Sequence, residues 1–172
     1  MADTIWVSAI AGDRRRGLLA FHGTWAPCAL GRSGIRLDKR EGDGATPAGR
    51  YELLGVLWRP DRVARPVTGL PVAKIRPDSG WCDDPADRRY NRPVRLPYRA
   101  SHERLWRDDR LYDLVVVIDH NFAHPVPGRG SAVFLHLAAP GFGPTAGCVA
   151  MTETTMRRLL ARARPGTTIT IG

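Results

Sequence analysis

The chain has 172 residues, which is enough for one domain with a real hydrophobic core and short for two, so we predict a single domain over residues 1–172. Its hydrophobic fraction of 43% and charged fraction of 25% exclude disordered and fibrous chains. Lysine and arginine outnumber aspartate and glutamate by 26 to 17, giving a net charge of +9, and all but two of the 26 are arginine.

This positive charge suits an anionic partner such as a wall polymer, an anionic surface or a nucleic acid, although scattered arginines without a special role would give the same excess. No zinc-finger, RNA-recognition or helix-turn-helix signature accompanies the arginines, so we expect no nucleic-acid partner. No apolar run approaches the roughly 20 residues that cross a bilayer, so we expect no membrane span. The N-terminal residues also lack the basic start and apolar stretch of a secretory signal.

The first half of the chain predicts short strands separated by turns. The segments 4–10 and 17–23 have strand composition, and 50–58 predicts a further strand. Between them, "KREGDGATPAG" at 39–49 is too rich in glycine, proline and aspartate to be helical. Prolines are dense from Pro60 to Pro97, which predicts an irregular region with short extended pieces around 71–76.

In the second half, Ser101 is a plausible N-cap for a short helix over 101–109. Buried strands are predicted at 112–119 and 131–138, from continuous runs of apolar and β-branched residues. A helix capped by Thr152 is predicted within 151–164, and 167–171 should close the chain as an edge strand. The sum is a mainly β domain with one or two short helices.

The stretch "GPTAGCVAM" at 143–151 places a cysteine in a turn of small residues, just before the predicted helix. A thiol near a helix N-terminus meets free backbone N–H groups, which favour a thiolate and a developing oxyanion. His136 lies near the end of the predicted strand 131–138, twelve positions before Cys148, and the glycines and prolines between them allow the loop to fold back. A cysteine beside a histidine is what nucleophilic acyl transfer requires, so Cys148 and His136 are the candidate catalytic pair.

The chain has three cysteines and no CxxC pair, so a thiolate zinc site or a thioredoxin-type motif is not expected. We expect neither metal nor cofactor. A disulfide between Cys28 and Cys82 stays open at this stage, because it depends on the compartment and on geometry.

Two stretches, "KREGDGATPAGRYEL" at 39–53 and "HLAAPGFGPTAGCVAM" at 136–151, together resemble the signature of the YkuD-type L,D-transpeptidases. The resemblance implies a β-sandwich-like catalytic domain that acts on peptidoglycan. It also implies that Cys148 is the nucleophile, that His136 is the base, oriented by a backbone carbonyl, and that Gly147 with its neighbours forms the oxyanion hole. Acylation of Cys148 by carbapenems would follow from the same resemblance.

The sequence departs from the usual family form, Ser-His-Gly-Cys followed by an apolar residue and Arg or Asn. Thr145 keeps the hydroxyl, Ala146 replaces the second histidine, and Ala150 stands where the Arg or Asn would be. The loss of that polar side chain predicts that the crosslink position differs from the common 3→3 bond.

Further residues are candidates for substrate binding because of their placement. Thr145 and Ala146 precede the cysteine, and His120 and Asn121 follow the strand 112–119. The middle insert carries four further candidates, which would form a wall or lid over the site. They are Asp83, Asp84, Tyr90 and Asn91.

The leading hypothesis is a monomeric, periplasmic cysteine transpeptidase that crosslinks peptidoglycan stem peptides as donor and acceptor through a thioacyl-enzyme. One alternative is a peptidoglycan hydrolase, an L,D-carboxypeptidase or an amidase, that uses the same pair and lets water take the acyl group. Another is a non-catalytic basic module that binds wall or nucleic acid.

Overall fold

The computed structural model describes residues 4–172 and contains fourteen strands, one α-helix and one 3-10 helix, η1 (Pro140–Phe142). The strands and the helix are, in chain order, β1 (Thr4–Ile10), β2 (Asp13–Phe21), β3 (Thr24–Ala29), β4 (Ile35–Arg36), β5 (Thr46–Pro47), β6 (Gly49–Trp58), β7 (Val72–Lys74), β8 (Ser79–Cys82), β9 (Arg92–Arg95), β10 (His102–Arg104), β11 (Leu114–Ile118), β12 (Phe134–Leu137), β13 (Val149–Met151), α1 (Glu153–Leu160) and β14 (Thr168–Ile171). The mainly β fold predicted from the sequence is therefore confirmed.

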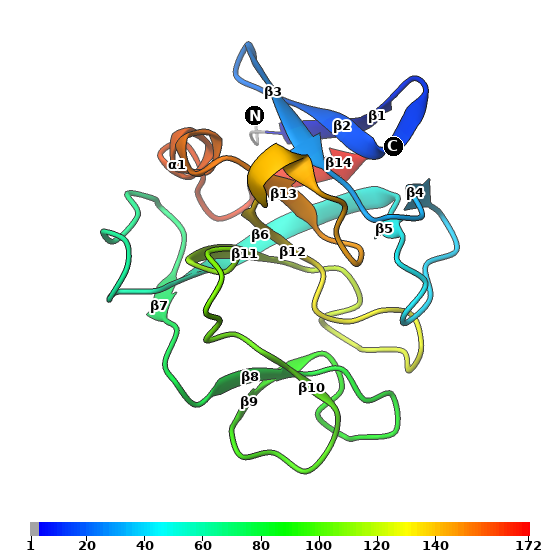
Figure 1. The fold of residues 1–172 in the computed structure, drawn as a ribbon, viewed down its shortest axis with the longest axis vertical. Coiled ribbons are helices and arrows are strands. Elements are labelled where there is room, and N and C mark those ends of the chain that lie inside the picture. Colours follow the sequence, from blue (N-terminus) through cyan, green and yellow to red (C-terminus); the bar gives the residue numbers. More distant parts are fainter. Residues whose placement is uncertain (1–3) are drawn as a thin grey trace.

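The main sheet closes on itself (Figure 1). Its strand order is β11-β12-β13-β3-β2-β1-β14-β6-β7, and β11 also pairs with β6. The first half of the long strand β6 pairs with β14, and its second half pairs with β11 on one side and β7 on the other. All strands of this sheet except β7 thus form a ring, which gives a barrel-like arrangement without free edges among them.

Alternating side chains of the barrel strands point into two different hydrophobic clusters. In β12, Leu135 and Leu137 belong to the barrel core, whereas Phe134 belongs to a second cluster outside the barrel. In β11 the side chains divide in the same way between the two clusters. Because both faces of β11 and β12 are covered, their sequences are continuous apolar runs rather than alternating ones.

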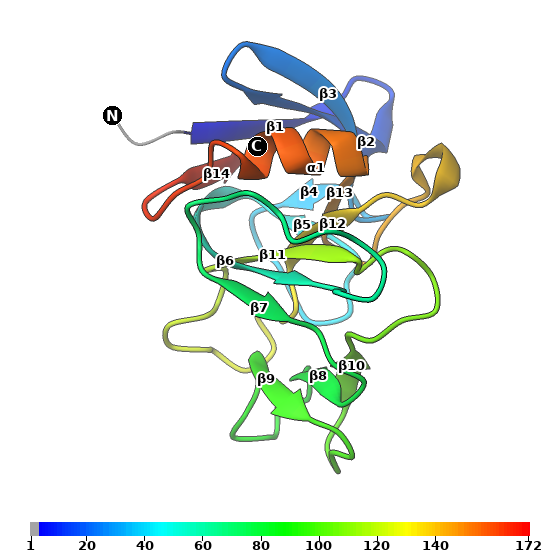
Figure 2. The same ribbon diagram turned by 90° about the vertical axis from the view of Figure 1, so that its left-hand side faces the viewer.

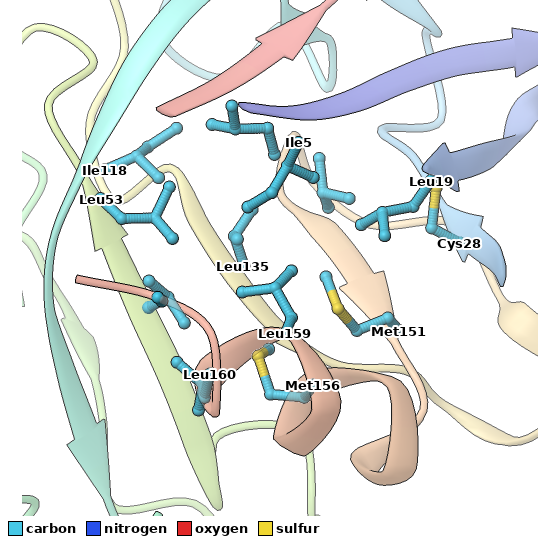
Figure 3. Packing of buried hydrophobic residues seen from close by; sticks show 14 of the residues in the cluster. Ile5, Leu19, Cys28, Leu53, Ile118, Leu135, Met151, Met156, Leu159 and Leu160 are labelled. Carbon is cyan, nitrogen blue, oxygen red and sulfur yellow. The ribbon is translucent and has the colours of Figure 1, made fainter. Parts of the chain in front are cut away.

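The core of the barrel is completed by α1 (Figure 3). Met156, Leu159 and Leu160 lie on the inner side of this helix, among core residues such as Leu135 of β12. Thr152 is its N-cap, as predicted, and its hydroxyl accepts a hydrogen bond from the Thr155 N–H at 3.2 Å. None of the helices in residues 4–172 has the length and apolar character that crossing a membrane requires.

A small sheet with the order β10-β8-β9 covers the outer cluster, and we call this segment, residues 79–104, the cap. Both ribbon views place it on the opposite side of the molecule from β1, β2 and β3 (Figures 1 and 2). Trp81 of β8 joins it to the barrel, since its ring stacks edge-on against Phe134 of β12 with centroids 5.0 Å apart.

Two local predictions are wrong. The predicted helix over 101–109 is instead strand β10, which pairs with β8 and completes the cap, so tertiary pairing overrides the local N-cap signal. The predicted edge strand at the C-terminus is β14, which lies between β1 and β6, with Ile169 and Ile171 in the core. The helix predicted within 151–164 is present with its Thr152 cap, but it ends at Leu160, and strand β13 separates its start from Cys148.

The three cysteines are buried and free. Cys28 lies in β3 within the barrel core, whereas Cys82 lies in β8 of the cap. The disulfide left open from the sequence is therefore not formed in this structure.

Leu160 is fully buried in α1 and provides a test of the packing of this helix against the barrel. We expect Leu160→Ala to lower the free energy of unfolding by about 2–5 kcal/mol, because it removes a buried isobutyl group and leaves a cavity. The exposed neighbour Arg158 provides the control, for which Arg158→Ala should cost less than about 0.5 kcal/mol. Urea unfolding measures both, and equal effects of the two substitutions would contradict this packing.

Candidate functional site

His136 and Cys148 are brought together by strand pairing. Strands β12 and β13 are parallel neighbours, with His136 opposite Ala150, so the same register sets Cys148 opposite Phe134. Alternation along the strands then directs both the imidazole and the thiol to the outer face of the barrel, beneath the cap. Both side chains line one cleft of about 550 Å³. They are 5% and 7% exposed, respectively.

The thiol of Cys148 is held by the backbone of two neighbouring residues. Its Sγ accepts a hydrogen bond from the Phe134 N–H at 3.3 Å and donates to the Ala132 carbonyl, also at 3.3 Å. Burial raises the pKa of Cys148 to about 12. The predicted helix N-terminus next to the cysteine is absent because β13 intervenes, and the resting group is a neutral thiol rather than a thiolate.

The imidazole of His136 is oriented by a backbone carbonyl. Nδ1 lies 2.8 Å from the carbonyl oxygen of Leu137, which can only accept, so Nδ1 carries the proton and Nε2 keeps its lone pair. The ring of Tyr112 packs edge-on against the imidazole, with centroids 5.2 Å apart. Burial lowers the pKa of His136 to about 4, so the imidazole is neutral at pH 7.

The loop before Cys148 is fixed at Thr145. Its N–H donates to the Leu30 carbonyl at 2.9 Å, and its carbonyl accepts from the Arg32 N–H at 3.0 Å. Its hydroxyl donates to the Cys148 carbonyl at 2.7 Å and accepts from the Gly147 N–H at 3.0 Å. The Gly147 N–H, one of the expected oxyanion donors, is therefore bound to Thr145 in the resting site.

Gly147 joins the two motifs that the sequence analysis singled out. Its φ is +145°, and a Cβ there would lie 2.7 Å from the Ala45 carbonyl oxygen in the motif 39–49. The same Cβ would lie 3.6 Å from Lys39 Nζ. Only glycine lets the cysteine loop approach this motif so closely.

The motif 39–49 is a turn built around the carboxylate of Asp43. It accepts hydrogen bonds from Lys39 Nζ at 2.5 Å, from the Arg40 N–H at 2.8 Å and from the Ala45 N–H at 2.8 Å. Burial opposes ionisation of this carboxyl, but the hydrogen bond from Lys39 and those from the backbone outweigh it and lower its pKa. This ion pair holds the Lys39 side chain at the wall of the cleft.

The candidate substrate-binding residues divide into two groups. Thr145 and Ala146 line the cleft, whereas Asp84, Tyr90, Asn91, His120 and Asn121 are not among its lining residues. In the turn that follows β8, the Asp84 carboxylate accepts from the Ala86 N–H at 2.9 Å. In the loop after β11, His120 Nε2 lies 3.1 Å from the Arg129 carbonyl oxygen. Asp84 thus caps a local turn, whereas Asn91, His120 and Asn121 hold the loops next to the cleft through hydrogen bonds to backbone groups.

Asn91 is the centre of that support. It is 3% exposed, and its Oδ1 accepts from Trp81 Nε1 at 2.9 Å and from the Ala132 N–H at 3.0 Å. Its Nδ2 donates to the Asn121 carbonyl at 2.7 Å and to the His120 carbonyl at 3.2 Å. Because the Ala132 carbonyl accepts the hydrogen bond from the Cys148 thiol, Asn91 links the cap to the position of Cys148.

Tyr90 supports the same loop through Glu41 of the 39–49 motif. The Tyr90 hydroxyl donates to Glu41 Oε2, which also accepts from the Ser131 hydroxyl at 2.8 Å. The Gly130 N–H donates in turn to the Tyr90 oxygen at 3.1 Å. The cap, the motif and the loop before β12 are thus joined by buried and partly buried hydrogen bonds.

Sequence reasoning missed most of the cleft wall contributed by the cap. Glu103 of β10 lines the cleft and accepts a hydrogen bond from the Tyr112 hydroxyl at 2.7 Å. Burial, its largest influence, raises the pKa of Glu103. Predicting 101–109 as a helix hid this residue, whereas Lys39 and Glu41 were within a recognised motif and could have been chosen.

Among residues 4–172, no cluster of three or more His, Cys, Asp or Glu side chains is arranged to hold a metal ion.

Comparison with known proteins gives one match. The family model YkuD, described as the L,D-transpeptidase catalytic domain, matches residues 12–171. Searches of curated proteins and of solved structures found no match.

The burial of Cys148 predicts low reactivity at neutral pH. Because a raised pKa leaves less thiolate at a given pH, alkylation of Cys148 by iodoacetamide should be slower at pH 7.5 than that of a free cysteine peptide, by about tenfold or more. The rate should still rise above about pH 10, where a free thiol with a pKa of about 8.5 has levelled off. Peptide mapping by mass spectrometry separates Cys148 from the other two cysteines. Fast labelling that levels off near pH 7 would reveal a preformed thiolate.

The buried neutral imidazole predicts a specific loss of stability in acid. The folded pKa of about 4 lies below the unfolded value, so between about pH 6.5 and 4 only the unfolded state gains this proton. The stability that His136 contributes is complete above pH 6.5 and falls by up to about 3 kcal/mol as the pH falls to 4.

Urea unfolding at pH 7 and pH 4 measures this loss, with His136→Gln as the variant that cannot titrate. We expect the wild type to lose more free energy of unfolding than the variant over this interval. Identical losses would show that His136 titrates normally in the folded protein.

Proposed function

The chain belongs to the YkuD family of L,D-transpeptidase catalytic domains, and we propose that it crosslinks peptidoglycan stem peptides through a thioacyl-enzyme on Cys148. The observation that carries the proposal is the pair at the floor of the cleft. A thiol and a neutral imidazole with an available Nε2 lie on one face of two paired strands, beneath a cleft large enough for a peptide. Since the substrate is a wall polymer, the proposed place of action is the periplasm.

In the proposed acylation, Cys148 Sγ leaves its hydrogen bond to Ala132 and attacks the carbonyl carbon of the donor stem. His136 Nε2 takes the thiol proton as the S–C bond forms, because both groups are neutral beforehand. The tetrahedral intermediate then breaks its C–N bond, and the imidazolium gives the proton to the leaving amine. The product is a thioester on Cys148.

In the second half of the proposed reaction, the amine of an acceptor stem attacks the thioester carbonyl. His136 takes a proton from the attacking nitrogen, the C–S bond breaks, and the same proton passes to the departing sulfur. A new amide joins the two stems and the resting thiol returns. Water in place of the amine would give hydrolysis by the same steps.

The oxyanion formed in each half requires donors from the loop 146–148. In the resting site the Gly147 N–H is bound to the Thr145 hydroxyl, so we propose that the oxyanion replaces this hydroxyl as the acceptor. The N–H groups of Ala146 and Cys148 are the neighbouring donors. Such a donor is typically worth about 3–4 kcal/mol in the transition state.

The cleft also bears on which bond is formed. Ala146 and Ala150 line it where the usual family form has a histidine and an Arg or Asn. Two small side chains in these places offer the stem no side-chain hydrogen bonds, so we propose that the stem is held in a different register. A crosslink other than the usual 3→3 bond would follow.

Purified protein incubated with disaccharide-peptide fragments tests this function by mass spectrometry of the products. We expect a crosslinked dimer from the wild type, and a loss of about 1,000-fold or more in its rate of formation for Cys148→Ala and for His136→Ala. Thermal unfolding of both variants shows whether they remain folded. Tandem mass spectrometry of the dimer identifies the bond and the acceptor.

Other products would change the assignment. Cleaved fragments without dimer would indicate a carboxypeptidase or an amidase that uses the same pair. Equal product patterns from the wild type and Cys148→Ala, with binding to the wall retained, would favour the non-catalytic binding module and contradict the proposal.

A further inference from the structure

A second hollow lies on the outer side of the cap, and we call it the basic groove. It has a volume of about 680 Å³, and five cations contribute to its lining. They are Lys74, Arg76, Arg88, Arg89 and Arg95. These residues come from β7, from the turns on either side of β8 and from β9, so folding gathers cations that are scattered in the sequence.

Cations outnumber the carboxylates in and beside the groove. One carboxylate, Asp78, belongs to its lining, and it lies 3.6 Å from Arg95 in an exposed ion pair. The nearby Asp87 carboxylate already accepts hydrogen bonds from the Tyr98 hydroxyl at 2.8 Å and from the Arg89 N–H at 2.7 Å. Within residues 4–172, the ion pairs of the structure do not include Arg76 or Arg88, and both side chains are exposed.

The groove and the catalytic cleft lie at opposite edges of the same small sheet. Strand β10 contributes Glu103 to the cleft, strand β9 contributes Arg95 to the groove, and β8 pairs with both. Neighbouring strands are about 4.8 Å apart, so the backbones that border the two hollows are separated by only about 10 Å. One extended polymer can therefore reach both hollows at once.

We infer that the basic groove binds carboxylate groups repeated along the wall polymer, so that the polymer is held at a second point while one of its stem peptides lies in the cleft. This inference rests on the proposed function, because it takes the polymer to be the substrate. Guanidinium groups bind carboxylates through paired hydrogen bonds, and the peptide stems of the wall present such groups at intervals. Attachment at two linked points raises the apparent affinity without new contacts at the cleft.

Pelleting with isolated sacculi tests the groove independently of turnover, because the assay uses full-length protein carrying Cys148→Ala. The test protein adds Arg76→Glu and Arg88→Glu. The matched control adds Arg158→Glu and Arg162→Glu, which make the same charge change on exposed residues of and beside α1, away from the cap. A milder pair, Arg76→Gln and Arg88→Gln, provides a second test, and thermal unfolding shows that each protein is folded.

We expect the groove reversal to weaken binding to sacculi about tenfold or more at 50 mM salt, the glutamine pair to weaken it less, and the α1 control to match the parent. Binding should persist with sacculi stripped of phosphate polymers by hydrofluoric acid. Equal losses from the groove and α1 reversals, or no loss from the groove reversal, would overturn the inference.

Binding that disappears with stripped sacculi and is competed by polyphosphate would assign the groove to a phosphate polymer and would also overturn it. Since all these proteins lack the nucleophile, a failure of the proposed transpeptidation does not alter the reading of this assay.

Discussion

The parallel pairing of β12 with β13 is the constraint on which the rest of the site depends. It fixes His136 opposite Ala150, two residues after Cys148, and directs both reactive side chains outward from a closed barrel. The core behind these strands, including Leu135 and Met151, keeps that register from slipping, because a shift by one residue would exchange the buried and outward faces. The cap then covers the outward face and encloses the cleft.

Enclosure has an electrostatic consequence. Removing the pair from water raises the pKa of Cys148 and lowers that of His136, so the neutral forms persist across the physiological range. Within residues 4–172, no helix N-terminus lies at the sulfur of Cys148 to offset the rise in its pKa. Instead, the backbone holds the thiol and the Leu137 carbonyl fixes the imidazole tautomer. In the proposed reaction, the thiol of Cys148 must therefore pass its proton to His136 as its sulfur attacks the substrate carbonyl.

Much of this arrangement could be predicted from the sequence. The continuous apolar runs predicted the buried strands around His136, and the flexible loop between His136 and Cys148 predicted that the two side chains meet. That the motif at 39–49 reaches the same cleft, through the close approach of Gly147 to the Ala45 carbonyl, was not predicted. The cap could not be predicted, because its short strands are stabilised by pairing with one another and by aromatic packing rather than by local patterns. For the same reason Asn91 was predicted to bind substrate, whereas its buried amide is used by the cap and the loop before β12.

The most direct test of a neutral, buried pair is the pH dependence of kcat/KM for acylation of the protein, which reports the ionisations of the free enzyme. Intact-mass measurement of the thioester at early times gives this rate. The account predicts a rate that is constant from about pH 5.5 to 8 and falls only at lower pH, as the buried imidazole of His136 takes up a proton near its pKa of about 4. A fall centred near pH 6.5, or an optimum confined to pH values where an ordinary cysteine–imidazolium pair exists, would contradict it.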